Sequence, residues 1–288
     1  MAPVSSSPVD LQVLRSVLFA PASDEHKLTK ALASTADAVV ADLEDATAPD
    51  EKEAARGIVE TLFADAEARS ARALRVNAPG TEWFDGDLEL ANRLELDLLM
   101  LPKATPQTVA ALGRGGPPVL AIVESAEGLR LAYETAAAER VFALALGTHD
   151  LGAELRTSPR SDGLEILYAR SKVVADSAAA GRRPPFDTVY LDVRDPAGLE
   201  EECLLANTLG FRGKICIHPG QLEVVNRVFA PSEAELAWAR RVLEAYEQGL
   251  REGRGAVALD GKMVDMPIVR RAERLLSEAR VTTESESA

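Results

Sequence analysis

Two apolar stretches of this chain each end on a carboxylate. One reads Ala121-Ile-Val-Glu124, and the other reads Leu144-Ala-Leu-Gly-Thr-His-Asp150. Apolar runs of this length are typical of strands buried on both faces, which accept a charge only where they emerge from the sheet. We therefore expect Glu124 and Asp150 at strand carboxyl ends, where two converging carboxylates would bind a hard cation such as Mg²⁺. Two solvated strand-end acids are the alternative.

The composition limits the class of protein. With 288 residues and 47% hydrophobic content, the chain can form one large α/β domain or two small ones. A net charge of −14 without a basic cluster argues against nucleic acid or an anionic membrane as a partner. We expect a cytoplasmic protein, because no run is long enough to span a bilayer and the first ten residues lack a secretory signal pattern. The two cysteines, Cys203 and Cys216, are interpreted as buried apolar residues.

The order of the elements predicts a (β/α)₈ TIM barrel with a C-terminal helical extension. Strand-like runs occur at 15–21, 38–45, 73–79, 97–103, 118–125, 141–150, 187–193 and 213–219. Segments with helical spacing lie between them at 53–68, 105–112, 126–138, 164–180 and 198–209. Such alternation indicates a parallel sheet, and eight units fit a closed barrel of roughly 250 residues. An open doubly wound sheet is the alternative, but no Gly-rich dinucleotide fingerprint follows any strand.

We divide the chain into four segments: an N-terminal arm (1–14), the barrel (15–230), a helical extension with a loop that caps the active site (231–280), and a flexible tail (281–288). In a TIM barrel, side chains at the carboxyl ends of the strands converge on one face, where active sites form. Polar residues at those positions are Asp42, Glu44, Asp45, Arg75, Asn77, Lys103, Glu124, Asp150, Asp192 and His218. Ion pairs that hold the rim together are the alternative role for some of them.

Several spaced motifs resemble one enzyme family in the same order. They include Asp42-Leu-Glu-Asp45, Arg75-Val-Asn77, Leu101-Pro-Lys103, the Glu124 and Asp150 stretches, Ile217-His-Pro219 and Gly261-Lys-Met-Val-Asp265. Over about residues 15–279 the chain resembles the HpcH/HpaI aldolase and citrate lyase β-subunit family. The resemblance implies a TIM barrel and a Mg²⁺-dependent carbon–carbon lyase that acts on citryl, malyl or citramalyl thioesters. It also implies that Glu124 and Asp150 are the metal ligands and that Arg75 binds the oxoacid.

The reaction that this resemblance implies gives these residues a chemical purpose. Cleavage of a 3-hydroxyacyl thioester yields an oxoacid (oxaloacetate, glyoxylate or pyruvate) and an acetyl thioester, and the oxygens that gain charge need stabilisation. Mg²⁺ acts as a Lewis acid, and Arg75 supplies a fixed cation. Glu44 is a candidate to orient Arg75 or metal-bound water, and Asn77 is a candidate neutral hydrogen-bonding neighbour. Helix-start ion pairs, Asp45 with Lys52 or Glu44 with Arg56, are the alternative.

Asp265 is the candidate acid/base. It lies in a hairpin-like segment beyond the eight strands, before a helix whose first turn contains Pro267. In relatives that the chain resembles, the matching aspartate acts in the active site of a neighbouring subunit. The resemblance therefore implies a homo-oligomer, a trimer. In the alternative interpretation, Asp265 only caps the final helix.

Thioester binding would need a local cation. Lys27 and Lys30, after the first strand, are candidates for the phosphates of coenzyme A or of a phosphopantetheine arm, although solvated lysines are the alternative. Lys214 and His218 lie where barrels often bind phosphate. Compared with the family pattern, Ala22 replaces a glycine, which argues against a close approach of the backbone to a ligand there. His149 replaces an acidic residue beside the expected metal, so metal affinity or substrate preference is expected to differ.

Three functions fit the sequence. The first is a free-standing lyase on coenzyme A thioesters, and the second is a citrate lyase β subunit that acts on an acyl carrier protein. The third is a non-catalytic assembly subunit, which the joint presence of Glu124, Asp150, Arg75 and Asp265 disfavours. The sequence does not distinguish the first two.

Overall fold

Parallel strands form the centre of the larger of two compact units. The computed structural model describes residues 10–65 and 69–286, and its chain divides into the units Met1–Arg227 and Val228–Ala288. This boundary lies near the expected division after residue 230. The strands of the first unit are β1 (Ser16–Pro21), β2 (Ala38–Asp42), β3 (Ala71–Arg75), β4 (Leu98–Leu101), β5 (Val119–Val123), β6 (Val141–Leu146) and β7 (Lys214–Cys216).

The strands pair in the order β6-β5-β4-β3-β2-β1-β7, and all pairs are parallel. The sheet closes through two residues, because Phe186 pairs with Ala145 of β6 and Asp187 pairs with Lys214 of β7. The expected TIM barrel is confirmed, with its seventh strand reduced to these two bridges. The predicted strand at 187–193 is therefore wrong beyond Asp187.

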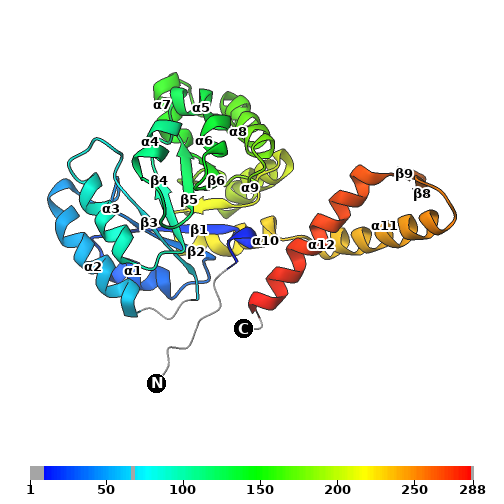
Figure 1. Cartoon of the computed structure of the whole chain (residues 1–288), viewed down its shortest axis with the longest axis horizontal. Helices are drawn as coiled ribbons and strands as arrows, with labels where there is room; N and C mark the ends of the chain where they lie inside the picture. Colours follow the sequence, from blue (N-terminus) through cyan, green and yellow to red (C-terminus); the bar gives the residue numbers. More distant parts are fainter. Residues whose placement is uncertain (1–9, 66–68, 287–288) are drawn as a thin grey trace. The chain divides into compact units, whose positions relative to one another are not determined.

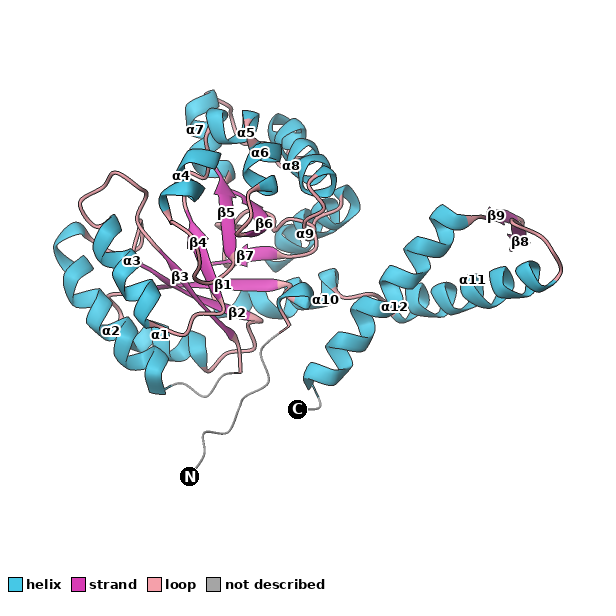
Figure 2. Cartoon of the chain, in the orientation of Figure 1, coloured by secondary structure: helices cyan, strands magenta, loops and turns pink. Residues whose placement is uncertain are grey.

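Helices surround this barrel (Figures 1 and 2). They are α1 (Glu25–Leu32), α2 (Lys52–Asp65), α3 (Phe84–Arg93), α4 (Pro106–Ala111), α5 (Ala126–Arg130), α6 (Ala132–Ala137), α7 (Thr148–Leu155), α8 (Leu167–Ala179), α9 (Pro196–Leu209) and α10 (Leu222–Phe229). Several begin directly after the loop that leaves a strand, where a polar side chain satisfies the free N–H groups of the first turn. Asp24 caps α1, Thr105 caps α4 and Ser125 caps α5 in this way.

The interior of the barrel is filled by small and branched side chains at alternate positions. Ala38 and Val40 of β2, Ala71 and Ala73 of β3, and Leu120 and Ile122 of β5 belong to one buried cluster. Successive strand residues point to opposite faces, so the intervening residues face the helices; Val39 and Ala121 among them are buried and Arg72 is half-buried. Both strand faces are apolar, which explains the near-continuous apolar runs in the sequence.

The second unit is a helical hairpin with its own core. Helices α11 (Glu233–Arg251) and α12 (Met266–Glu286) flank a small antiparallel pair, β8 (Val257–Leu259) and β9 (Lys262–Val264). A capping box of Ser232 and Glu235 begins α11, and Pro267 lies in the first turn of α12, as expected. Because α12 runs to Glu286, helix continues into the segment 281–288 that the sequence indicated as a tail. Within the described ranges, no helix is both long and apolar enough to cross a membrane.

Candidate active site

Three charged residues occupy the next inward-facing positions, at the carboxyl ends of the barrel strands. Asp42 follows Val40 at a spacing of two residues, Arg75 follows Ala73, and Glu124 follows Ile122. Asp42 and Arg75 are also direct partners in the ladder between β2 and β3. The same alternation that fills the core therefore places these three side chains on top of it.

Arg75 is held by carboxylates. Its Nε donates to Asp42 Oδ1 at 2.7 Å, and its Nη2 donates to Asp42 Oδ2 at 2.6 Å, a bidentate pair. Its Nη1 lies 2.8 Å from Glu44 Oε2 and 3.7 Å from Asp45 Oδ2, and the guanidinium lies 4.8 Å from the centre of the Phe19 ring. Although burial lowers the pKa of Arg75, Asp42, Glu44 and Asp45 raise it above its ordinary value. Arg75 is therefore a permanent, immobilised cation.

Glu44 is a buried carboxylate that is only partly neutralised. Its Oε1 lies 3.5 Å from Lys103 Nζ, whereas its Oε2, despite the Arg75 contact, accepts no well-aligned hydrogen bond from the residues described. Burial raises the pKa of Glu44 to about 7, with Asp45 and Asp42 adding to the rise and Arg75 and Lys103 opposing it. Near neutral pH, this carboxyl can gain or lose a proton.

Glu124 lies beside Glu44 and is positioned from two sides. Its Oε1 accepts a hydrogen bond from the Lys103 backbone N–H at 2.7 Å. A side chain at Gly147 would place a Cβ only 2.8 Å from Glu124 Oε2, so the glycine leaves room for the carboxylate. Burial, and next the charge of Glu44, raise the pKa of Glu124 to about 7, and Asp150 also contributes. Glu124, Glu44 and Asp150 thus share one electrostatic site.

Asp150 lies on a helix, not at a strand end. Strand β6 ends at Leu146, and Asp150 is an exposed residue in the first turn of α7. The expectation that Asp150 ends a strand was therefore wrong, although the loop at Gly147 still turns the start of α7 back toward Glu124.

A buried lysine holds the loop that follows β2. Lys52 Nζ donates to the backbone oxygens of Leu43 and Glu44 and to Asn77 Oδ1, at 2.6, 2.8 and 2.6 Å. Asn77 Nδ2 in turn donates to Leu43 O and to Asp87. The Asn77 side chain therefore makes its hydrogen bonds within the protein, and its expected role beside the reacting groups stays a prediction. The alternative helix-start pairs are not formed among the described residues. Lys52 binds the loop backbone and Asn77 instead of Asp45, and Arg56 binds Asp87 and Glu53 instead of Glu44.

These groups fit a divalent cation. Five carboxylates (Asp42, Glu44, Asp45, Glu124 and Asp150) lie near three cations (Arg75, Lys103 and Lys52), an excess of negative charge. Glu124 Oε2 accepts no hydrogen bond within the described part of the chain. Across residues 10–65 and 69–286, no cluster of three or more His, Cys, Asp or Glu side chains is arranged to hold a metal. Glu124 and Asp150 could thus supply only part of a coordination shell, which suits Mg²⁺, an ion that keeps water and substrate oxygens.

Comparison with known proteins identifies the family. The family model for "HpcH/HpaI aldolase/citrate lyase" matches residues 15–219, and the model for "C-C_Bond_Lyase of the TIM-Barrel fold" matches residues 164–282. The chain belongs to the HpcH/HpaI aldolase/citrate lyase family. The match covers the strand ends described above, so the resemblance in the motifs is confirmed.

Three relatives of the family illustrate its range. The citrate lyase subunit beta of Escherichia coli K12 is 38% identical, over 93% of this chain and 94% of its own length. A (3S)-malyl-CoA thioesterase of Cereibacter sphaeroides is 39% identical, over 92% and 94%. The crystal structure of protein CitE from Mycobacterium tuberculosis, in complex with magnesium, acetoacetate and coenzyme A, superposes with a TM-score of 0.80 at 38% identity and covers 93% of this chain and 99% of that chain.

The remaining candidate residues, Lys27, Lys30 and Asp265, lie on helices and helix starts. Lys27 is in α1, where it pairs with the capping residue Asp24 (2.9 Å), and Lys30 is exposed in the last turn of that helix. Asp265 precedes α12 in the second unit and is half-buried; its backbone oxygen accepts from Val269. Their roles in this family member stay predictions.

The two departures from the family pattern differ in their surroundings. Ala22 is buried, with its N–H donating to Asp42 O at 3.1 Å, whereas His149 is exposed in the first turn of α7. Their effects on affinity also stay predictions.

One sequence hypothesis fails on burial. Lys214 is fully buried, and its Nζ donates to Asp187 Oδ2 at 2.9 Å; it therefore cannot bind phosphate. Arg170 makes a bidentate pair with the same carboxylate, at 3.0 and 3.1 Å. This buried cluster lies where the barrel closes, and His218 accepts a backbone hydrogen bond from Gly220 after β7. Three contributors to the site, Lys52, Gly147 and the Lys103 N–H, were missed, because contacts made by or to the backbone leave no motif.

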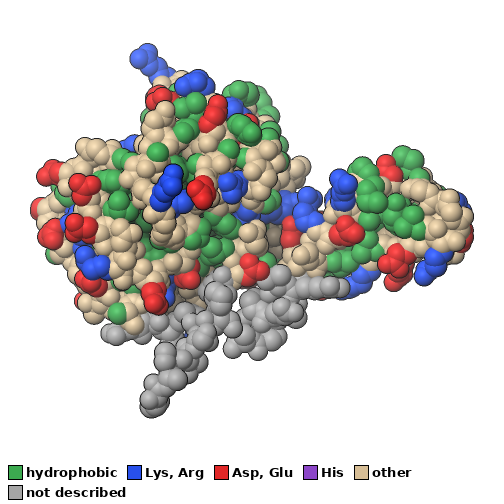
Figure 3. Space-filling view, in the orientation of Figure 1, with side chains coloured by type: hydrophobic (Ala, Val, Ile, Leu, Met, Phe, Trp, Pro, Cys, Tyr) green, Lys and Arg blue, Asp and Glu red, His purple; other side chains and the backbone are tan. Residues whose placement is uncertain are grey.

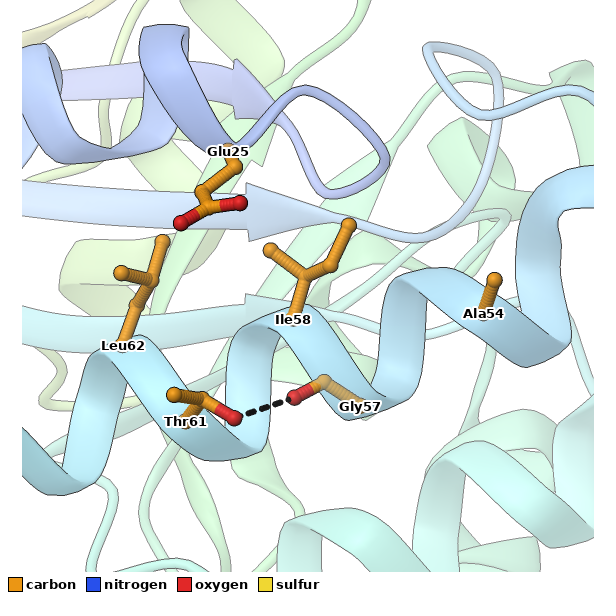
Figure 4. A pocket seen from close by; sticks show the side chains of 6 residues that line it. All are labelled: Glu25, Ala54, Gly57, Ile58, Thr61 and Leu62. Carbon is orange, nitrogen blue, oxygen red and sulfur yellow. Dashed lines mark hydrogen bonds between the residues drawn. The ribbon is translucent and has the colours of Figure 1, made fainter.

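A surface depression of about 320 Å³ lies between α1 and α2 and contains none of the expected site residues. Its lining consists of Glu25, Ala54, Gly57, Ile58, Thr61 and Leu62 (Figure 4). The only ionisable side chain among them is acidic, which does not suit coenzyme A phosphates.

On the molecular face in Figure 3, basic and acidic side chains are interspersed and form no large basic patch.

Proposed function

We propose that this chain is a Mg²⁺-dependent carbon–carbon lyase. It would cleave, or form in reverse, a 3-hydroxyacyl thioester such as citryl-, malyl- or citramalyl-CoA, giving a 2-oxo acid and an acetyl thioester. The observation that carries the proposal is the buried Glu124 carboxylate beside Glu44, Arg75 and Asp150 at the barrel mouth. The relatives support the substrate class, since the names of two contain citrate lyase and malyl-CoA and the third binds magnesium and coenzyme A.

Glu124 and Asp150 would hold the metal. When bound, Mg²⁺ supplies Lewis acidity toward the oxygen that becomes the oxo group. Arg75, fixed by Asp42, offers its remaining N–H donors to a carboxylate or developing oxyanion. Glu44 orients Arg75 and, with a pKa of about 7, can hold a proton at the site.

The bond changes define what the protein must provide. A base removes the hydroxyl proton, the carbon–carbon bond breaks, and its electron pair passes to the thioester as an enolate. An acid then protonates the enolate carbon to give the acetyl thioester. We assign this acid/base step to Asp265 and the binding of coenzyme A phosphates to Lys27 and Lys30.

The proposal is tested by product analysis. Purified enzyme with citryl-, malyl- and citramalyl-CoA should release a 2-oxo acid and acetyl-CoA in a reaction that EDTA abolishes and Mg²⁺ restores. Release of the hydroxy acid and free coenzyme A instead would make it a thioesterase. Glu124→Ala should lose Mg²⁺-dependent binding of pyruvate or oxaloacetate in calorimetric titration, and wild-type affinity in this variant would refute the metal assignment.

A citrate lyase β subunit that acts on an acyl carrier protein is the second candidate, favoured by the E. coli relative. A higher kcat/KM with citryl-acyl carrier protein than with citryl-CoA would support it. A non-catalytic assembly role would be supported only if neither thioester is cleaved. The cytoplasmic location expected from the sequence stays a prediction that cell fractionation can test.

We further propose a homo-oligomer, a trimer, in which Asp265 of one subunit serves a neighbour. Asp265 belongs to the unit that follows the closed barrel. Inactive Asp265→Asn and inactive Glu124→Ala chains, dissociated and reassembled together, should regain activity in hybrid oligomers. If hybrids form and stay inactive, Asp265 acts within its own chain or only caps α12.

A further inference from the structure

Lys103 has a backbone conformation that is unfavourable for a lysine. Its φ is +48°, in the left-handed region that glycine adopts freely and that a side chain makes costly. The reason for this conformation is visible at its N–H, which donates to Glu124 Oε1 at 2.7 Å. Glycine would meet this need without strain. The backbone alone therefore does not explain why a lysine occupies the position.

The Lys103 side chain has a different relation to the site from that of Arg75. Both cations contact Glu44, but the Arg75 side chain is 7% exposed and the Lys103 side chain is 55% exposed. Arg75 makes two short hydrogen bonds to Asp42. The contact of Lys103 is longer, because its Nζ lies 3.5 Å from Glu44 Oε1. An ammonium has three N–H donors and a flexible stem. Lys103 can thus donate to a ligand while it stays beside Glu44.

The charge of the site explains why such a cation is needed. Lys103 Nζ lies 3.5 Å from Glu44 Oε1, and its side chain is 55% exposed, so this ammonium is a solvent-accessible cation beside a buried carboxylate. Citryl, malyl and citramalyl groups each carry a free carboxylate besides the thioester. This anion must approach a cluster that already holds five carboxylates. A solvent-accessible cation there lowers the repulsion.

We infer that Lys103 is a substrate-binding residue whose ammonium, held at the barrel mouth between Glu44 and solvent, binds a carboxylate of the hydroxyacyl group or 2-oxo acid. This inference rests on the proposed function. The Lys103 backbone and side chain then have separate tasks: the N–H positions Glu124, and the ammonium receives the anion.

The two tasks can be separated by substitution. Lys103→Gly keeps the N–H and favours the left-handed backbone but removes the ammonium, and Lys103→Arg keeps a cation. Lys172→Met is the matched control, because it removes a lysine charge from the outer helix α8, where Lys172 pairs with Asp176. Calorimetry would measure the binding of Mg²⁺ alone and of pyruvate in the presence of saturating Mg²⁺. Thermal unfolding would report the fold.

Lys103→Gly should weaken pyruvate binding roughly tenfold to a hundredfold, the range expected for one charge-assisted hydrogen bond. Its Mg²⁺ affinity should be unchanged or higher, since a nearby cation is lost. Lys103→Arg should recover most of the pyruvate affinity, and Lys172→Met should match the wild type. In thioester cleavage, KM should rise more than kcat falls.

Two results would overturn the inference while the proposed function stands. In one, wild-type and Lys103→Gly proteins bind pyruvate equally. In the other, Lys103→Gly lowers the affinity for Mg²⁺ alone by the same factor as the affinity for pyruvate, which would make the residue purely structural. If the wild type binds neither Mg²⁺ nor a 2-oxo acid, the proposed function fails and this inference fails with it.

Discussion

Gly147→Ala should damage the metal site while leaving the barrel folded. A Cβ at this position would lie 2.6 Å from Glu124 Cβ and 3.2 Å from Ile122 Cγ2. Ordinary contacts begin at 3.4 Å, so position 147 and Glu124 must separate by about 0.8 Å (3.4 minus 2.6). The Gly147 φ of −102° suits alanine, so the conflict is steric and not one of backbone conformation.

The size of the effect follows from this displacement. Overpacking of a well-packed position typically costs about 1–3 kcal/mol of unfolding free energy, a few degrees in Tm for a chain of this size. A misplacement of about 1 Å in a catalytic site can reduce the rate on the order of a hundredfold. We therefore expect kcat/KM for thioester cleavage to fall about a hundredfold and Mg²⁺ affinity to fall with it.

Gly57→Ala is the control, because a Cβ at Gly57 in α2 meets no atom within 4 Å. It should stabilise the protein by about 0.5–1 kcal/mol through helix propensity and leave kcat/KM unchanged. The assays are calorimetric titration with Mg²⁺, thermal unfolding and steady-state cleavage. Wild-type Mg²⁺ affinity and kcat/KM in folded Gly147→Ala would refute the reasoning that this glycine makes room for the Glu124 carboxylate.

Three further changes test other parts of the site and fold. Arg75→Lys removes the bidentate pair with Asp42 and should reduce the rate of thioester cleavage roughly a hundredfold, about 3 kcal/mol of transition-state stabilisation. A native cleavage rate in this variant would show that Arg75 does not stabilise the transition state. In the metal-free protein, the pKa values of Glu44 and Glu124 are raised from 4.5 to about 7, so the folded state binds more protons than the unfolded state between these values. The free energy of unfolding should therefore fall as pH rises from about 4.5 to 7, by roughly 1.4 kcal/mol per pH unit for each proton that the folded state binds in excess of the unfolded state. Chemical denaturation of wild type and of Glu44→Gln/Glu124→Gln at several pH values measures this, and equal slopes would contradict it. Asp187→Asn removes the fully buried carboxylate that contacts both Arg170 and Lys214 and leaves them only the partly exposed Glu202 as a shared anion. It should cost about 3–5 kcal/mol in denaturant unfolding, against less than about 1 kcal/mol for Asp176→Asn at the more exposed Lys172 pair, and similar losses in both variants would argue against the buried cluster as the closure of the barrel.

The barrel was predictable because its signals are periodic. Apolar runs alternate with helical segments along the chain, and alternation within strands placed Asp42, Arg75 and Glu124 at one end of the core. Their contacts were not predictable. Whether Arg75 faces a ligand or a carboxylate depends on side-chain geometry across two strands, and sequence spacing contains no such information.

The two errors in the strands have physical causes. The run 187–193 contains apolar residues but pairs only at Asp187, and Leu191 and Val193 are largely exposed. Ion pairs of Asp187 with Arg170 and Lys214 take the place of a longer ladder there. The run ending at Asp150 contained a usable warning, since Gly147 interrupts it directly before α7, and an isolated glycine often marks the end of an element.

The excess of carboxylate side chains at the barrel mouth links the stability of the fold to ligand binding. Burial and the repulsion of neighbouring carboxylates raise the pKa values of Glu44 and Glu124 by disfavouring their charged forms, so the ionised metal-free site destabilises the fold. A divalent cation relieves the same repulsion when it binds, so part of its apparent affinity comes from the removal of this cost. The same balance explains why the site needs Arg75 buried and Lys103 exposed: the buried Arg75 is paired with the Asp42 carboxylate, and the accessible Lys103 remains for an anionic substrate once the metal is bound.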